Sequence, residues 1–553
     1  MLHSYELRKE QKNRFLFLLL PLAIIALSNA CKKESSNEQP ASNDVITVNV
    51  NTTEKYQEMD GFGASDAWSC QFVGKNWPLT KREQIADLLF SRDTDQYGDP
   101  KGVGLSIWRF NVGSGSTEQG NNSYINDPWK RTECFLNSDG SYDWTKQAGQ
   151  QWFLNAAKAR GVEKTLMFSY SPPVYYTQNQ KAFSPGGWHM NIQPGYMSNF
   201  ADFLVSVVKH FKDQGINVDY LSPVNEPQWG WNAGSNGWAS QEGTPASNAD
   251  IAQLSTLLSS KLSNNGLSTK VTLAEAGSID YLYKTTDADR GHQIQDFFTP
   301  SSSDYVGNLS NVANLISTHS YWTVWPVSSL ISSREAVHDQ ILATNSSLKY
   351  WETEYCILES ANTDMADGWN RDLNMDLALY VDRIIYYAIT KGYASSWQWW
   401  LAISRGDYKD GLIYIDDGTN TGMTGTLVPD YCNNDGYVRP SKLLWGLGNF
   451  SLFVRPGMKR IYTGSPDILP NQNYGLLNSA FIDESSKKLV VVLINYSSNA
   501  KTVSLNMKSG SLNGKLTTYV TSDDSNLKRT KNVDPGNISI EANSITTLVG
   551  YYN

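Results

Sequence analysis

The feature that most constrains the fold is an alternation, between residues 60 and 400, of short apolar runs with longer helical patterns. Short apolar runs suit buried strands, and helices between them are typical of parallel β/α units. Eight units predict a (β/α)8 barrel over residues 59–447; an open doubly wound sheet is the alternative, and the count of eight favours the barrel. The runs are GFGASDAW at 61, GLSIWRFNV at 104, KTLMFSYS at 164, VDYLSPVNE at 218, KVTLAEA at 270, LISTHSY at 315, LKYWETEY at 348 and SSWQWWL at 395.

The sequence changes character after about residue 450, where short alternating runs are separated by Gly, Asn and Ser. These runs predict an all-β sandwich over residues 448–553. VITVNVN, at residues 45–51, is also strand-like, so residues 45–58 are expected to join this sandwich. The fold class is therefore α/β, a barrel with a side-associated sandwich. The C-terminal runs are KKLVVVLINYS, KTVSLNMK, KLTTYVTS, ISIEANS and ITTLVGYY.

The N-terminus has a basic start, an apolar core FLFLLLPLAIIAL and the ending SNAC, which closes on Cys31. The apolar run is short for a membrane span, so residues 1–30 are interpreted as a secretion signal. A Cys directly after small residues resembles a bacterial lipoprotein signal, which implies lipidation of Cys31. Residues 31–44 are polar and lack periodicity, as in a tether. The expected location is the outer membrane, cell surface or periplasm through that lipid anchor alone; a plain secretory signal is the alternative.

The net charge of the chain without its predicted signal limits which kinds of ligand it suits. Without residues 1–30, which hold four basic and two acidic side chains, 42 basic and 53 acidic residues remain, a net charge of −11. A net acidic chain argues against nucleic acid as a partner and is compatible with a neutral polysaccharide. The protein is expected to be a monomer. The four remaining cysteines allow disulfides, but buried thiols are slightly favoured: Cys70, Cys134, Cys356 and Cys432.

The carboxyl ends of barrel strands carry function, and here they carry acids, amides and aromatic residues. No Ser-His-Asp order, no Cys-His pair and no metal-ligand set is present, so no cofactor or metal is expected. The residues at these ends are Arg109, Asn111, Tyr170, Ser171, Asn225, Glu226, Glu275, His319, Tyr321, Glu352, Glu354, Trp397, Gln398 and Trp399.

Two carboxylates at one barrel mouth, surrounded by aromatic residues, suit cleavage of a glycosidic bond. One must be protonated to help the leaving oxygen depart, and the other must be ionised to attack the anomeric carbon or activate water. A shared apolar site raises one pKa, and ionisation of the partner raises it further. The alternative for any single acid is a structural ion pair, for example with Arg109.

The motifs along the chain resemble those of glycoside hydrolase family 30, within clan A of the retaining glycosidases. The resemblance covers residues 46–553 and implies that Glu226 is the general acid/base and Glu354 the nucleophile of a double displacement. It also implies carboxyl groups about 5 Å apart. The motifs are GFGAS at 61, WRFNVG at 108, SPP at 171, NEPQW at 225, WETEYC at 351 and WQWW at 397.

Other residues of the mouth keep two interpretations. Glu352 shares a strand face with Glu354 but lies one layer deeper, and only Glu354 fits the nucleophile pattern of the family. Glu275 either binds substrate or forms a structural ion pair. Asn225 suits a hydrogen bond to the sugar 2-hydroxyl, and Arg109 suits stabilisation of the nucleophile. The remaining substrate-binding candidates are Asp66, Tyr170, His319, Tyr321 and the possible sugar platforms Trp68, Trp229, Trp231, Trp397 and Trp399.

The resemblance is closest to endo-acting β-1,6-galactanases among bacterial members of the family. An exo-acting β-glycosidase for fucosides, galactosides or glucosides and a xylanase are the alternatives among enzymes. A surface lipoprotein that binds carbohydrate without cleaving it is the alternative outside them, and the presence of both carboxylates argues against it.

Overall fold

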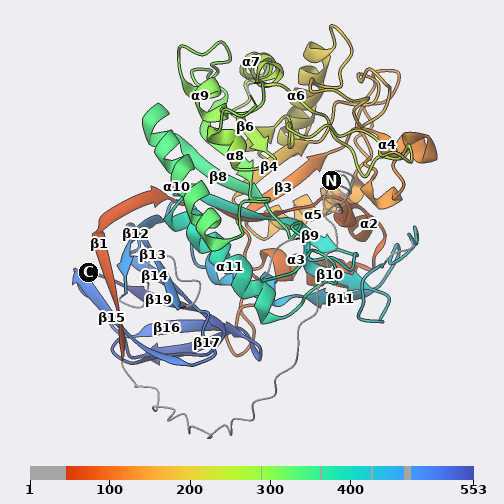
Figure 1. The fold of residues 1–553 in the computed structure, drawn as a ribbon. Coiled ribbons are helices and arrows are strands. Elements are labelled where there is room, and N and C mark those ends of the chain that lie inside the picture. The colour runs from red at the N-terminus through yellow and green to blue at the C-terminus, as the bar shows by residue number, and fades with distance from the viewer. Residues whose placement is uncertain (1–44, 288, 361–363, 425–426, 466–474) are drawn as a thin grey trace, which may run out of the picture.

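The computed structural model describes residues 45–287, 289–360, 364–424, 427–465 and 475–553, so the predicted signal, tether and lipidated Cys31 lie outside the described residues. The described chain forms a barrel and a separate sheet, side by side (Figure 1). Within the described ranges, no helix combines the length and the apolar character needed to cross a membrane.

Eight parallel strands form the barrel, and the strand order confirms the predicted topology. The last strand pairs with both its predecessor and the first strand, which closes the ring. All eight predicted runs contain a strand, although the fourth shrinks to three residues. The strands are β2 (Gly61–Ser65), β3 (Ile107–Val112), β4 (Lys164–Ser169), β5 (Tyr220–Ser222), β6 (Lys270–Ala276), β7 (Val312–His319), β8 (Lys349–Glu354) and β9 (Ser396–Ser404).

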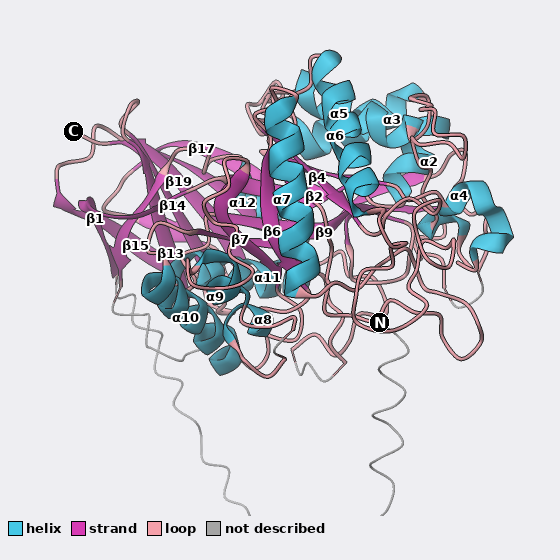
Figure 2. Ribbon diagram, turned by 90° about the horizontal axis from the view of Figure 1, so that it is seen from above, coloured by secondary structure: helices cyan, strands magenta, loops and turns pink. Residues whose placement is uncertain are grey.

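Helices follow the strands and cover the outside of the barrel (Figure 2). The helix after β5 shows how the sequence sets their bounds, because Ser247 and Asp250 form a capping box at its start. The chain leaves it at Gly266, whose φ of +64° suits glycine. The helices are α2 (Ser69–Asn76), α3 (Leu79–Phe90), α4 (Ser116–Gln119), α5 (Ala148–Ala159), α6 (Met197–Asp213), α7 (Asn248–Asn264), α8 (Asp280–Tyr283), α9 (Gln293–Phe298), α10 (Val327–Thr344), α11 (Met375–Thr390) and α12 (Lys442–Ser451).

The C-terminal strands form a nine-stranded sheet that encloses one apolar core, as expected for the predicted sandwich. The N-terminal strand lies within this sheet, between β12 and β15. Three strands of the sheet were not predicted, because β12, β13 and β17 lack a clean apolar alternation. The strands are β1 (Ile46–Glu58), β12 (Lys459–Gly464), β13 (Leu476–Asp483), β14 (Lys488–Asn495), β15 (Lys501–Ser509), β16 (Leu516–Ser522), β17 (Ser525–Val533), β18 (Ile538–Ile540) and β19 (Ser544–Tyr551).

The barrel and the sheet share one apolar core through α11 and α12, and Figure 1 shows α11 between the two units. Asn449 of α12 donates to Thr547 Oγ1 of β19 over 2.9 Å, and the hydroxyl of Thr547 donates back to the Asn449 carbonyl over 2.7 Å. The boundary predicted between residues 447 and 448 therefore falls inside a helix that packs on both units.

The structure also shows two smaller features that the sequence left undecided. β9 continues past the barrel and pairs with β10 (Gly411–Asp416), which pairs in turn with β11 (Tyr437–Pro440). The four cysteines of the described residues are buried free thiols rather than disulfides: Cys70, Cys134, Cys356 and Cys432.

Candidate active site

The polar side chains at the carboxyl ends of the barrel strands converge on one mouth. Each is at most 3% exposed, so the mouth places charged groups in an environment of low dielectric constant, where their interactions are strong. The residues are Asp66, Arg109, Asn111, Tyr170, Asn225, Glu226, Glu275, His319, Tyr321 and Glu354.

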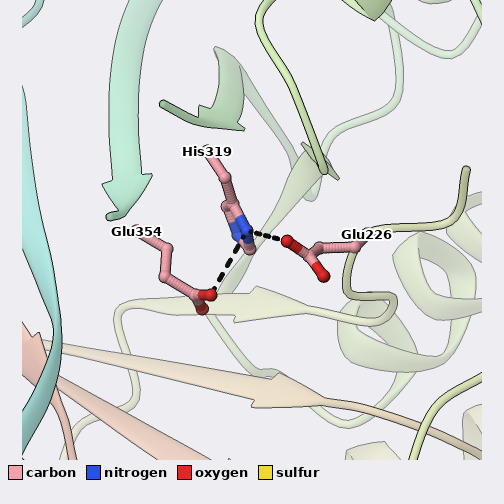
Figure 3. Close-up of side chains that lie close together, drawn as sticks. All are labelled: Glu226, His319 and Glu354. Carbon is pink, nitrogen blue, oxygen red and sulfur yellow. Dashed lines mark hydrogen bonds and ion pairs between the residues drawn. The ribbon is translucent and has the colours of Figure 1, made fainter. Parts of the chain in front are cut away.

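The two expected catalytic acids face one another across this mouth, with His319 between them (Figure 3). One oxygen of Glu226, one oxygen of Glu354 and a ring nitrogen of His319 all lie within 4.8 Å of one another. His319 Nδ1 is 2.9 Å from Glu226 Oε1 and 3.4 Å from Glu354 Oε1. Glu226, in the loop after β5, and Glu354, at the end of β8, are 128 residues apart in sequence and therefore form one pair only in the folded barrel.

The backbone of the loop after β5 aims Glu226 into the mouth. Glu226 has a φ of +48°, a left-handed conformation that costs a non-glycine residue free energy. The loop is held on both sides of this point: the Glu226 N–H donates to the Glu275 carbonyl over 2.8 Å, and Trp231 Nε1 donates to the Glu226 carbonyl over 3.0 Å. Trp231 therefore positions Glu226, and its indole is only 8% exposed.

Arg109 organises the ionised side of the mouth. Its guanidinium donates to Glu354 Oε2 over 2.5 Å, to Glu275 Oε2 over 2.6 Å and to Asn225 Oδ1 over 2.8 Å. Tyr321 donates to the other oxygen of Glu354 over 2.9 Å. Both oxygens of Glu354 thus accept hydrogen bonds, as those of an ionised carboxylate do. Because Asn225 Oδ1 faces Arg109, its amide nitrogen remains available to a sugar hydroxyl.

Glu275 and Glu352, the two other acids at the ends of these strands, form buried ion pairs. Burial alone would raise the pKa of Glu275, but Arg109 and His319 outweigh it and lower that pKa to about 2. Glu352 accepts from Arg334 over 2.7 Å and from Ser320 over 2.5 Å. Among the acids of strand β8, Glu354 is therefore the one that lies opposite Glu226 with His319 between them.

The charges of the mouth balance when Glu226 holds a proton. Burial raises the pKa of Glu226; contact with His319 opposes this, and the charge of Glu354 raises the pKa further. Burial alone would lower the pKa of His319, but the carboxylates of Glu354, Glu226 and Glu275 raise it to about 9. With a proton on Glu226, two cations, Arg109 and His319, face two carboxylates, Glu275 and Glu354. A protonated His319 also offers no lone pair to a metal ion.

Several polar atoms of the mouth have no hydrogen-bond partner among the described residues. Leaving buried polar atoms unpaired costs free energy, so their concentration in one place indicates a polar ligand that pairs with them. Asp66 is an example: Asn111 N–H and Gln150 occupy one of its oxygens, the other is unpaired, and burial raises its pKa to about 7. The unpaired atoms include Asp66 Oδ2, Arg109 Nε, Asn111 Oδ1 and Nδ2, Tyr170 Oη, Glu226 Oε2, Trp229 Nε1, Glu275 Oε1 and Trp397 Nε1.

The predicted sugar platforms lie in different settings. Trp397 and Trp399 are completely buried, and Trp399 Nε1 donates to the Asp410 carbonyl over 2.7 Å, so both form the wall of the mouth. Trp68 is covered on one face by the Lys130 ammonium, 4.5 Å from its ring centre. Trp229 is partly exposed and contacts Trp322.

Trp322, Trp188 and Glu359 are residues of this region that the sequence did not indicate. Trp322 follows Tyr321 directly and is 45% exposed, whereas Trp188 is 54% exposed. The run YW after β7 was the only available signal for Trp322. Nothing in the sequence around Trp188 or Glu359 distinguishes them from ordinary loop residues.

Comparison with known proteins places the chain among glycosidases. A model of "O-Glycosyl hydrolase family 30" matches residues 45–414. An endo-beta-1,6-galactanase of Hypocrea rufa is 22% identical over 483 residues, which cover 83% of each chain.

Solved structures share the fold. A conserved exported protein from Bacteroides fragilis superimposes with a TM-score of 0.82 at 36% identity, over 91% of this chain and 100% of the other. The catalytic domain of xylanase C from Talaromyces cellulolyticus reaches a TM-score of 0.63 at 22% identity, over 91% of this chain and 99% of the other. The barrel with its lateral sheet is thus common to all of them.

Proposed function

Since the chain belongs to glycoside hydrolase family 30 and is a glycoside hydrolase, we propose that it cleaves β-1,6-galactan internally, with retention of the anomeric configuration. The observation that carries retention is the approach of Glu226 and Glu354 oxygens to within 4.8 Å. Retaining glycosidases hold these carboxyl groups about 5–5.5 Å apart, whereas inverting enzymes leave about 6.5–9.5 Å for a water molecule. The similarity to an endo-β-1,6-galactanase supports the substrate.

The first step transfers the glycosyl unit to the protein. Glu354 attacks the anomeric carbon and forms an ester, while the bond to the glycosidic oxygen breaks and Glu226 gives that oxygen its proton. Arg109 and Tyr321 hold Glu354 in line for the attack. Asn225 is placed to bind the 2-hydroxyl, an interaction that strengthens in the transition state.

The charge of the mouth is the same before and after this step. Glu354 loses its negative charge in the ester, and Glu226 gains one when it gives up its proton. Two carboxylates therefore continue to face Arg109 and His319. In the second step Glu226 takes a proton from water, whose oxygen displaces Glu354 and restores both acids.

This exchange predicts that the pKa of Glu226 depends on the charge of Glu354. The Glu354→Gln variant keeps the shape and removes the charge, so the pKa of Glu226 should fall, because Glu354 is one of the groups that raise it. Protonated Glu226 would then disappear at lower pH than in the native protein. Carbon-13 NMR of labelled glutamate carboxyl groups, assigned with Glu226→Gln, measures the change. An equal or higher pKa in Glu354→Gln contradicts the exchange.

The proposed substrate is tested with a panel of β-1,6-galactan, β-1,6-glucan, β-1,3-galactan and xylan. Internal cleavage of β-1,6-galactan gives a range of oligosaccharides at early times, whereas an exo-acting enzyme gives one small product. Proton NMR of the first-formed anomer decides stereochemistry, and an inverted product would overturn the retaining mechanism. A protein that binds galactan and cleaves none of the panel would be the carbohydrate-binding alternative.

We also propose that Cys31 is lipidated and anchors the enzyme to the bacterial outer membrane. The support is the small-residue ending before Cys31 in the signal sequence. Expressed in a bacterium, the native chain should partition into detergent and carry an acylated N-terminal peptide by mass spectrometry. Cys31→Ser should be released or remain uncleaved, and a native mature chain without acyl mass would contradict the proposal.

A further inference from the structure

Two tryptophans beside the mouth retain about half of their surface exposed. Trp322, in the loop after β7, is 45% exposed, and Trp188, in the loop after β4, is 54% exposed. Trp229 lies between them. Trp322, Trp229 and Trp188 are called the aromatic strip below. Exposed indoles of this size are uncommon next to a buried polar site and mark surfaces that bind ligands.

The inner end of the aromatic strip lies beside the nucleophile. Trp322 follows Tyr321, whose hydroxyl donates to Glu354 over 2.9 Å. The ring centre of Trp322 is 5.7 Å from that of Tyr321 and 5.3 Å from that of Trp229, in an edge-to-face arrangement with Trp229. An exposed indole face is thus one side chain away from the reacting centre.

The backbone of Trp322 is held in a costly conformation. Its φ is +58°, in the left-handed region that disfavours bulky residues. Its N–H donates over 2.9 Å to Glu359, an acid only 7% exposed, whose other oxygen accepts from Tyr355 over 3.0 Å. A buried carboxylate and a strained backbone both cost free energy. Their use to hold one exposed side chain indicates that its orientation matters for function.

The rest of the aromatic strip is also fixed in place. Trp229 packs over Gly277, where an added Cβ would lie 2.4 Å from Trp229 Nε1. Trp188 stacks under Arg290, whose guanidinium is 3.9 Å from its ring centre and donates to the Gln228 carbonyl over 2.6 Å. A Cβ on Gly230, next to Trp229, would lie 3.9 Å from the Trp188 ring. Trp188 is therefore the outer end of the aromatic strip.

The position of Glu226 gives the aromatic strip a direction. Glu226 protonates the leaving oxygen, so the departing sugars must extend from its side of the scissile bond. The Trp229 N–H donates to the Glu226 carbonyl over 3.2 Å, and the ring of Trp229 in turn contacts that of Trp322. The aromatic strip thus extends on the side from which the leaving group departs.

We propose that the aromatic strip binds the leaving-group sugars in two successive subsites, with Trp322 stacking on the inner sugar and Trp188 on the outer one. A sugar ring has an apolar face of C–H groups, which an exposed indole covers and removes from water. The proposal rests on the proposed function, because both subsites are filled only when cleavage releases a leaving group of at least two sugars.

The experiment compares Trp322→Ala and Trp188→Ala on two kinds of substrate. β-1,6-Galacto-oligosaccharides of increasing length place sugars in the leaving-group subsites, whereas β-galactobiosyl fluoride leaves those subsites empty. Trp322→Ala should lower kcat/KM about 10- to 100-fold on the oligosaccharides, as expected for losing a large apolar contact, and less than about 2-fold on the fluoride. Trp188→Ala should lower kcat/KM only for substrates with two or more leaving sugars.

Two controls separate binding from folding. Trp322→Phe keeps an aromatic face and should retain most of the activity on oligosaccharides. Tyr97→Ala removes an aromatic side chain that is 71% exposed and should change neither activity. The backbone carbonyl of Tyr97, which the variant keeps, accepts from Arg529 of the lateral sheet. With the fluoride as donor and galactobiose added as acceptor, the ratio of transfer product to hydrolysis product should be lower for Trp322→Ala than for the native protein.

Equal losses of Trp322→Ala on the fluoride and on the oligosaccharides would show a structural role and overturn the proposal. Unchanged activity on every oligosaccharide would overturn it as well. If the native enzyme leaves galactan intact but cleaves another β-glycan, the proposed substrate is wrong. The same comparison with oligosaccharides and the fluoride of that glycan then still decides whether the aromatic strip binds leaving-group sugars.

Discussion

Glu354→Gln is expected to lower kcat on β-1,6-galactan by roughly 10⁴-fold or more, the scale seen when a catalytic nucleophile is removed. An amide has the shape of the carboxylate but cannot form the glycosyl ester. Arg109 and Tyr321 keep their positions, so substrate binding should change little. Initial rates and the dissociation constant of an oligosaccharide, measured by calorimetry, separate the two effects.

The smaller variant Glu354→Ala gives a second readout of the same role. It leaves space for azide, which attacks the anomeric carbon of an activated β-glycoside from the side that Glu354 occupied. The product should be the α-glycosyl azide, identified by NMR. A β-azide, or full activity of Glu354→Gln, would contradict the assignment.

Glu352→Gln is the matched control for Glu354→Gln, because both acids lie on one strand and are buried. Glu352 pairs with Arg334 rather than with the mouth. Breaking a buried ion pair costs about 3–5 kcal/mol, so this variant should melt at a lower temperature. Its folded fraction should keep the native preference among leaving groups. A loss comparable to that of Glu354→Gln in fully folded protein would point to Glu352 instead.

Glu226→Gln is expected to lower kcat on β-1,6-galactan by about 10²- to 10⁴-fold, the usual contribution of a general acid. The loss arises because a sugar alkoxide departs poorly without a proton. A β-galactobiosyl fluoride, whose leaving group needs little protonation, should still form the glycosyl-enzyme. That intermediate should accumulate, since Glu226 is also the base that activates water, and intact-protein mass spectrometry detects it.

Azide also tests the acid/base role of Glu226, and the expected azide product has the opposite anomeric configuration. In Glu226→Ala it attacks the glycosyl ester of Glu354 without needing a base, so turnover of the fluoride should recover and the product should be the β-glycosyl azide. Glu242→Gln is a matched control. Glu242 is a buried acid of the same loop that accepts from Ser116 and Thr132, two residues that do not belong to the mouth. Its losses should not depend on the leaving group; losses of Glu226→Gln that are equally independent would exclude an acid role.

The barrel was predictable because each of its strands is buried on both faces and therefore forms a nearly continuous apolar run. β3 and β9 are examples, with every residue buried. The lateral sheet was predictable only in part. β17, SNLKRTKNV, lies at an edge of the sheet and exposes lysines and asparagines, so its sequence lacks the expected alternation. The sequence of β1 predicts a strand of this sheet, but no local pattern indicates that it pairs with β12 and β15.

The meeting of Glu226 and Glu354 was predictable because two motifs at strand ends, NEPQW and WETEYC, carry the residue type that the proposed reaction needs. Their neighbours were not. Glu275, like Glu226, is an acid at the carboxyl end of a predicted barrel strand. Only the structure shows that Arg109 and His319 lie beside Glu275 and lower its pKa to about 2. The pKa of an acid depends on its distance from charged groups on other strands, and the local sequence does not contain those distances.

Sequence alone determined the alternation that closes into a barrel and predicted the two candidate acids, because burial and strand periodicity are local properties of the chain. Only the tertiary structure shows that the pKa of Glu226 is raised and that of Glu275 is lowered, since these directions follow from burial and from Arg109, His319 and Glu354 meeting from strands β3, β7 and β8. It also decided that Trp322 and Trp188, from loops far apart in the chain, lie in one strip beside Trp229. Contacts between distant segments form only when the barrel closes, and that closure turns separate motifs into a site.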